Sequence, residues 1–243
     1  MVKGKDGKSG MIGVIHARGG SKRVPFKNIA LLGGKPLVSY MIKAALGSKY
    51  LNRVIVSTDH PEIKRISLEY GAEVPFTRPP KLAEDCPSEW VTRHAVEFVE
   101  AQEGGKIDIV VTMQPTAPFC TGYDIDRCVE LLLNDPDITS AFSAKVITER
   151  PEWMFLFKEN SRADLFLKGE IKGGRGISQE LPKLAIPNGG IYATRRDTLF
   201  DEGVIISKRT AVHIMPFEKS VDIDEAIDLE FANLLMKKQA QNK

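Results

Sequence analysis

The chain has 243 residues, 42% of them hydrophobic, and its 34 basic and 32 acidic residues give a formal net charge of +2. This balance argues against nucleic-acid binding through a broad electrostatic field, and no apolar run approaches the roughly 20 residues that span a bilayer. We therefore expect neither a nucleic acid nor a membrane as partner, and one α/β domain with an inserted element.

The first residues and the cysteines bear on the compartment. Residues 1–10 are basic and lack the apolar stretch of a signal peptide, so we expect a disordered tail there. Cys86, Cys120 and Cys128 are odd in number and show no C-x-x-C spacing, which argues against a zinc site or a disulfide framework. The pattern is compatible with a reducing cytoplasm, where we expect the protein to act.

Strands and helices alternate through the first 143 residues. In chain order the periodicity predicts strand 11–15, helix 36–46, strand 53–58, helix 61–70, helix 88–101, strand 107–112, helix 123–133 and strand 139–143. Gly71 is the type of residue that ends a helix in a left-handed conformation. Because single helices separate most strands, we expect right-handed crossovers and a mostly parallel sheet with helices on both faces.

The alternation breaks between residues 144 and 186, where short aromatic pieces and Gly/Lys-rich pieces follow one another. We expect a nucleotide-binding catalytic domain over 11–143 and 187–243, interrupted by an inserted dimerisation or lid element over 144–186. Its aromatic density suits a contact between subunits, and a lid packed on its own chain is the alternative. A closing helix is predicted for 223–237.

A basic, glycine-containing loop follows the first predicted strand. Gly19 and Gly20 permit a sharp turn that brings backbone N–H groups close to an anion. The same loop carries four cations: Arg18, Lys22, Arg23 and Lys27. Parallel sheets bind ligands at the carboxyl ends of their strands, so phosphate binding is favoured over a solvated surface loop, although the loop is neither a Walker A nor a GxGxxG motif.

The segment from His16 to Asn28 closely resembles the signature of the acylneuraminate cytidylyltransferases, or CMP-sialic acid synthetases. The resemblance implies a nucleotide-diphospho-sugar transferase-like variant of the Rossmann fold, with CTP as co-substrate. It implies CTP contacts from Ala17, Arg18, Gly19, Gly20, Ser21, Lys22, Lys27, Asn28, Arg78 and Asp85.

The segment from Arg78 to Asp85 resembles the RPxxLAxD segment of this family. The resemblance implies that Arg78 contacts the cytosine base, and the planar fork of a guanidinium offers several donors to a base edge. A proline-rich loop with a surface arginine is the alternative interpretation.

The segment from Met113 to Pro118 follows a predicted strand and resembles the family's QPTSP turn. Its two prolines fix the backbone and present Gln114 and Thr116 at the carboxyl end of that strand. The resemblance implies that Gln114 and Thr116 belong to the substrate site, with Gln114 facing the sugar. An ordinary structural turn is the alternative.

The segment from Pro187 to Tyr192 is similar to the family's NGAIY strand. Asn188 is a candidate for hydrogen bonds to sugar hydroxyls, and Gly189 allows the backbone to approach a ligand closely. An Asn-Gly turn that opens a strand explains the same residues without a ligand.

Asp222 and Asp224 precede the last predicted helix. In an extended segment residues i and i+2 face the same side, so both carboxylates can share a hard cation with phosphate oxygens. The family position implies a Mg²⁺ or Mn²⁺ site. The alternative is that Asp224 caps the helix while Asp222 lies on a surface.

The implied reaction is attack by the anomeric hydroxyl of a sugar acid on the α-phosphorus of CTP, with pyrophosphate leaving. Alignment and charge neutralisation would supply the catalysis. The residues implied to act in catalysis are Arg18, Lys22, Lys27, Asp222 and Asp224. His16 is the one candidate general base by position, and a structural histidine is the alternative.

Three departures from the family pattern concern the sugar: Cys120, Trp153 and Ser178 replace basic residues. The latter two positions are linked in the sialic-acid branch to the sugar carboxylate, and Arg175 or Lys172 could supply the missing charge. We therefore expect the substrate to be another nine-carbon keto acid, of legionaminic or pseudaminic type. From the inserted element we also expect a homodimer. A nucleotidyltransferase for another base or an eight-carbon keto acid, and a non-catalytic nucleotide-binding regulator, remain the alternatives.

Overall fold

A six-stranded sheet forms the centre of the chain in the computed structural model, which describes residues 10–167 and 182–241. Its strand order is β10-β6-β9-β5-β1-β4. The strands are β1 (Met11–His16), β4 (Arg53–Ser57), β5 (Ile109–Met113), β6 (Ser140–Ile147), β9 (Leu184–Arg195) and β10 (Thr210–Ile214). β1 is parallel to β4 and β5, β10 is parallel to β6, and β9 is antiparallel to both neighbours. The predicted mostly parallel sheet is confirmed.

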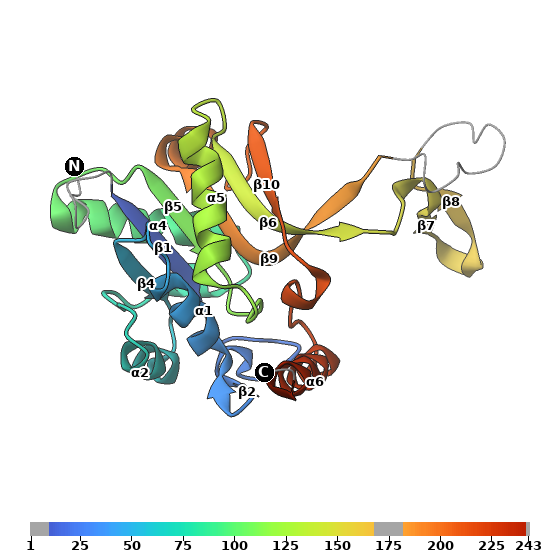
Figure 1. The fold of residues 1–243 in the computed structure, drawn as a ribbon, viewed down its shortest axis with the longest axis horizontal. Helices are drawn as coiled ribbons and strands as arrows, with labels where there is room; N and C mark the ends of the chain where they lie inside the picture. Colours follow the sequence, from blue (N-terminus) through green and yellow to red (C-terminus); the bar gives the residue numbers. More distant parts are fainter. Residues whose placement is uncertain (1–9, 168–181, 242–243) are drawn as a thin grey trace.

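Helices cover both faces of this sheet (Figure 1), because its strands present apolar side chains alternately to the two sides. On one side, Met11 and Ile15 of β1 join the core formed with α1 (Leu37–Leu46), α2 (Pro61–Glu69) and α5 (Gly122–Asn134). On the other side, Ile12 and Val14 pack with α4 (Ser88–Glu103) and the short π-helix η4 (Thr198–Glu202). Among the described residues, no helix is long and apolar enough to cross a bilayer.

The last helix brings the end of the chain back to the first loop. α6 (Ala226–Gln241) packs with the hairpin β2 (Leu31–Leu32) and β3 (Lys35–Pro36), which follows η1 (Lys27–Ile29). The predicted start at residue 223 is wrong by three residues. The Asp228 carboxylate accepts hydrogen bonds from the N–H groups of Asp224 and Glu225, at 2.9 and 2.7 Å, so the two preceding aspartates stay outside the helix.

Strands β6 and β9 continue past the sheet as a two-stranded arm that projects from the body (Figure 1). The arm carries η2 (Pro151–Trp153), η3 (Glu159–Ser161) and the hairpin β7 (Phe155–Phe157) and β8 (Ala163–Leu165). Both long strands run through the expected boundaries of the insertion at 144 and 186, so those boundaries cut regular structure.

A bulge interrupts the pairing of β6 with β9 at the base of the arm. Phe142 is paired with Tyr192 and Ala144 with Pro187, so Ser143 alone stands opposite residues 188–191. The Ser143 hydroxyl spans this gap: it donates to Asn188 Oδ1 at 2.6 Å and accepts from the N–H of Ile191 at 3.0 Å. Bulges redirect backbone and side chains, and they are common beside active sites.

Candidate active site

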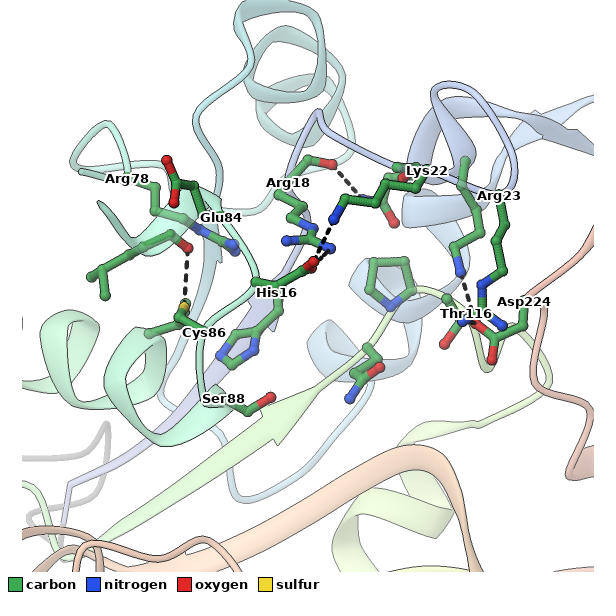
Figure 2. Close-up of a pocket in the computed structure, with 18 of the residues that line it drawn as sticks. His16, Arg18, Lys22, Arg23, Arg78, Glu84, Cys86, Ser88, Thr116 and Asp224 are labelled. Carbon is green, nitrogen blue, oxygen red and sulfur yellow. Dashed lines mark hydrogen bonds and ion pairs between the residues drawn. The ribbon is translucent and has the colours of Figure 1, made fainter. Parts of the chain in front are cut away.

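A cavity of about 760 Å³ opens at the carboxyl ends of β1 and β5 (Figure 2). Twelve residues that the sequence singled out line it: His16, Arg18, Ser21, Lys22, Arg23, Lys27, Asn28, Arg78, Asp85, Gln114, Thr116 and Asp224. They come from four segments far apart in the sequence, as expected for loops that follow parallel strands.

The first loop is held in place by contacts of its glycine and asparagine residues. The N–H of Gly19 donates to Asp59 Oδ1 at 2.9 Å, and a Cβ on Gly19 would meet the His60 ring at 2.8 Å. The Asn28 amide donates to the carbonyl of Arg18 at 2.8 Å and holds the two ends of the loop together. In this structure Asp59 therefore accepts the Gly19 N–H that we expect to bind a phosphate. Ala17, Gly19 and Gly20 do not line the cavity.

The four cations of the loop form two groups. Arg18 Nη2 and Lys22 Nζ each lie 2.6 Å from a carboxylate oxygen of Asp85, and hydrogen bonds from Lys22 and Arg18 lower the pKa of Asp85 to about 2. Arg23 Nη2 and Lys27 Nζ lie 3.0 and 3.1 Å from Asp224 Oδ1. Figure 2 shows the Asp224 group at one side of the cavity, with Arg18 and Lys22 at its centre.

The segment with the two aspartates is tied to the loop and to the turn after β5. The N–H of Ile223 donates to the Thr116 carbonyl at 2.8 Å, and the Ile223 carbonyl accepts from Lys27 Nζ at 2.9 Å. The Ile223 side chain is fully buried. Asp222 and Asp224 on either side of this anchor are therefore held beside the basic loop.

Asp222 is a half-buried carboxylate in contact with the β9 bulge. Burial raises its pKa, the nearby Asp224 raises it further, and Lys27 and Lys145 act against the shift. Gly189 has φ +74°, and a Cβ there would lie 2.5 Å from Asp222 Oδ2. Gly189 thus makes room for this carboxylate, which is a different role from the expected contact with the sugar.

Two buried oxygens next to the cavity, Asp222 Oδ1 and Thr116 Oγ1, form no hydrogen bond of good geometry with the described residues, although the Thr116 side chain lies close enough to Asp222 to lower its pKa. Thr116 satisfies this carboxylate only in part, so Asp222 keeps acceptor sites that could bind a ligand. Within the described residues no group of three or more histidines, cysteines and carboxylates could hold a metal. The donor set fits a hard cation that takes its other ligands from phosphate and water.

Arg78 lies at the other side of the cavity from Asp224 in Figure 2. Only 4% of its surface is exposed, and burial lowers its pKa to about 10. Its Nε donates to Ser57 Oγ at 3.1 Å and its Nη2 donates to the Ser57 carbonyl at 2.6 Å. Within the described part of the chain Nη1 has no hydrogen-bond partner, so it is available to a ligand.

His16 is held in a neutral, structural state. Its Nε2 lies 3.0 Å from the Thr92 hydroxyl, which in turn lies 2.9 Å from the Thr112 hydroxyl. Burial lowers the pKa of His16 to about 3, so the ring is too weak a base to accept a proton from a sugar hydroxyl at neutral pH. The structural alternative is therefore favoured.

Asn188 braces the bulge and does not line the cavity. It is 2% exposed, and its amide accepts from Ser143 and Gly190 and donates to Ser220 Oγ at 3.1 Å. In this structure both polar atoms of the Asn188 amide are thus engaged, so neither is free for the hydrogen bond to a sugar hydroxyl that we expect. Arg175, Lys172 and Ser178 lie outside the described residues.

A second pocket of about 300 Å³ adjoins the first, and Ser88 and Gln114 line both. Its wall combines the apolar residues Tyr192 and 204–206 with the carboxylate of Glu89. Sequence reasoning missed these residues, although Tyr192 belongs to the motif around Asn188. The run at 204–206 follows no motif and gave no signal.

The comparisons with known proteins agree with one another. A family model described as "Cytidylyltransferase" matches residues 12–240. The pseudaminic acid cytidylyltransferase of Campylobacter jejuni is 33% identical over 225 residues, which cover 92% of this chain and 95% of that protein. The CMP-N,N'-diacetyllegionaminic acid synthase of Legionella pneumophila is 32% identical over 230 residues, which cover 93% and 96% of the two chains.

The fold also matches a solved CMP:2-keto-3-deoxy-manno-octonic acid synthetase in complex with CTP. The TM-score is 0.67 at 22% identity, and the match covers 95% of this chain and 100% of that one.

Proposed function

The chain belongs to the cytidylyltransferase family and is a nucleotidyltransferase, and on that premise we propose how it transfers CMP. CTP is the donor, and the acceptor is the anomeric hydroxyl of a nine-carbon 2-keto sugar acid, with pyrophosphate as the second product.

The observation that carries this proposal is the contact between the two ends of the chain. Lys27 of the basic loop binds both Asp224 and the carbonyl of Ile223, nearly 200 residues further along the chain. Cations and carboxylates thus meet in one cavity with Arg78, and this arrangement suits a triphosphate whose α-phosphorus lies near the aspartates.

In this proposal the nucleotide lies along the cavity from Arg78 to Asp224. Arg78 Nη1 donates to the edge of the cytosine base, and Arg18 and Lys22 exchange Asp85 for the β- and γ-phosphates. Ser21 and Asn28 complete the wall of the loop. Lys22 and Arg18 then neutralise the charge that builds on the departing pyrophosphate.

The aspartates are proposed to hold Mg²⁺ or Mn²⁺, since two neighbouring carboxylates beside a basic loop, with few other protein ligands among the described residues, fit such a cation. When bound, the ion would supply positive charge that offsets the charge of the phosphates and lowers the pKa of the attacking hydroxyl. Lys27 and Arg23 fix the orientation of Asp224 toward the cavity. Gly189 leaves the space that Asp222 occupies.

We place the sugar across Gln114, which lines both pockets. The apolar wall at Tyr192, Ile205 and Ile206 suits acyl or deoxy substituents of a modified nine-carbon acid. The relatives named for pseudaminic and legionaminic acids support this class over sialic acid itself. The structural likeness to an enzyme named for an eight-carbon acid supports that substrate only as the second candidate.

We further propose that the arm joins two copies of the chain. Its exposed apolar side chains include Met154, Leu156, Phe157 and Phe166, and Phe157 is 86% exposed. Such a cluster is unusual on a free surface and is typical of interfaces. We propose a cytoplasmic location as well, because all three cysteines are free thiols, as a reducing compartment favours.

Pyrophosphate release tests the proposal directly, with CTP, UTP, ATP or GTP combined with pseudaminic, legionaminic, N-acetylneuraminic and eight-carbon keto acids. We expect turnover with CTP and a nine-carbon acid in the presence of Mg²⁺. Faster turnover with UTP would contradict the role of Arg78. CTP binding by calorimetry without turnover on any acid would instead support a non-catalytic regulator.

A further inference from the structure

The acceptor of the proposed reaction poses an electrostatic problem that the predicted site residues leave unsolved. In a 2-keto sugar acid the carboxylate is bonded to the same carbon that bears the reacting hydroxyl. A hydroxyl placed at Asp222 and Asp224 therefore brings a third carboxylate next to two others. Like charges at such short range repel in a partly buried site, so a further cation on this side of the aspartates, in addition to the ion proposed between them, would favour binding of the acid.

Most cations near the aspartates are already engaged. Lys27 binds Asp224 and the Ile223 carbonyl, and Arg23 also binds Asp224. Lys219, three residues before Asp222, lies 2.7 Å from a carboxylate oxygen of Asp124. The departures from the family pattern at Trp153 and Ser178 remove the cations that the resemblance implied for the carboxylate.

Lys145 lies on β6 at the base of the arm, and its position follows from the bulge. Two residues earlier, Ser143 bonds to Asn188, whose amide donates to Ser220 in the aspartate segment. Because the bulge interrupts the alternation of side chains at Ser143, the direction of the Lys145 side chain is given by its contact with a neighbouring segment. Its ammonium lies 5.8 Å from the ring centroid of Phe217, in η5 (Phe217–Lys219), which leads into Asp222.

No carboxylate among the described residues forms a salt bridge with Lys145, so its ammonium is available to bind an anion. The Lys145 side chain is half-buried. The aromatic face of Phe217 holds the ammonium without neutralising it. Its charge also acts on Asp222, where together with Lys27 it opposes the rise in pKa that burial causes.

We propose that Lys145 binds the carboxylate of the keto acid and thereby selects 2-keto acids over neutral sugars. This inference rests on the proposed function. Lys145 supplies from its own chain the charge that Trp153 and Ser178 lack. In this proposal the anomeric carbon of the keto acid lies between Asp222 and Lys145. Its hydroxyl faces the Asp222 carboxylate, and its own carboxylate faces the Lys145 ammonium.

The test compares Lys145→Met with Lys145→Arg and with the control Lys208→Met, using the acid that the wild type turns over best and the carboxamide of the same sugar. Lys208 is exposed and precedes β10, whose first residue pairs with Ser140 at the far end of β6. We expect Lys145→Met to raise the KM for the acid about 10- to 100-fold, as the loss of a charge-assisted hydrogen bond predicts, with the KM for CTP unchanged. Lys145→Arg should restore most of the affinity, and Lys208→Met should match the wild type.

The carboxamide provides the decisive comparison. In the wild type, replacing the acid by the carboxamide should lower kcat/KM by about the same factor as Lys145→Met lowers kcat/KM for the acid. In Lys145→Met itself, the same change of substrate should lower kcat/KM by less than about threefold. Fully additive losses, an unchanged KM in Lys145→Met, or a loss confined to Arg175→Met would overturn the assignment. If the Met variant does not fold, Lys145→Gln gives the same readout. Absence of turnover by the wild type on every acid would refute the proposed function instead.

Discussion

Replacing Gly189 by alanine should have two effects: strain in the backbone and a clash with the Asp222 carboxylate. The residue has φ +74°, a conformation that costs a non-glycine residue about 1–2 kcal/mol. The new Cβ would also lie 2.5 Å from Asp222 Oδ2 and 2.9 Å from its Cγ, well inside contact distance. Because backbone holds Gly189 in the bulge, we expect the Asp222 carboxylate to be displaced.

Gly104→Ala is the matched control. Gly104 has φ +68° at the end of α4, and a Cβ there would meet nothing within 4 Å. Both variants should therefore lose about 1–2 kcal/mol of unfolding free energy from backbone strain. Only Gly189→Ala should lose turnover, by at least about 100-fold, which corresponds to about 2.7 kcal/mol of transition-state stabilisation.

The assay is urea unfolding alongside steady-state pyrophosphate release over a range of Mg²⁺ concentrations. The apparent Mg²⁺ requirement of Gly189→Ala should rise, whereas that of Gly104→Ala should equal the wild type. If Gly189→Ala turned over as fast as Gly104→Ala while folded, the placement of Asp222 at the reacting centre would be refuted.

Asp224→Asn should lower kcat at least about 100-fold without preventing folding, because it removes the charge that faces Lys27 and Arg23, and a normal rate would reject the metal assignment. Arg78→Lys should raise the KM for CTP about 10-fold and leave the KM for the acid unchanged, since a lysine cannot bond to Ser57 and a base edge together. Burial alone would raise the pKa of Asp124, yet hydrogen bonds from His213 and Lys219 hold it well below its ordinary value. This carboxylate therefore stabilises the fold at neutral pH, and the stability advantage of the wild type over Asp124→Asn should shrink below about pH 4 in pH-dependent unfolding.

The parts of the fold that depend on local pattern could be predicted. The parallel strands, their helices and the left-handed Gly71, with φ +91°, follow from periodicity and glycine punctuation. An inserted element was also predicted, but the antiparallel direction of β9 and the continuation of β6 and β9 into the arm were not, because strand direction depends on partners far away in sequence. The start of α6 was misplaced because the Asp228 carboxylate, and not Asp224, takes the free N–H groups.

The candidate site shows the same division. The resemblance to the family implied that Asp224 would lie beside the basic loop, and the ion pair between Asp224 and Lys27 places them together. The sequence could not distinguish residues that face a ligand from residues that hold them. Gly19, Asn188 and Gly189 stand in motifs that resemble those of the family, yet in this structure they contact Asp59, Ser143 and Asp222. Lys145 stands in no motif, and its contact with Phe217 shows the direction of its side chain.

The arm and the aspartate segment are joined by hydrogen bonds at one place. β6 and β9 continue from the sheet into the arm, and the Ser143–Asn188–Ser220 hydrogen bonds lie at the bulge where the two strands emerge. Asp222 follows Ser220 by two residues, so we expect contact between the arm and a second copy of the chain to be felt at this carboxylate.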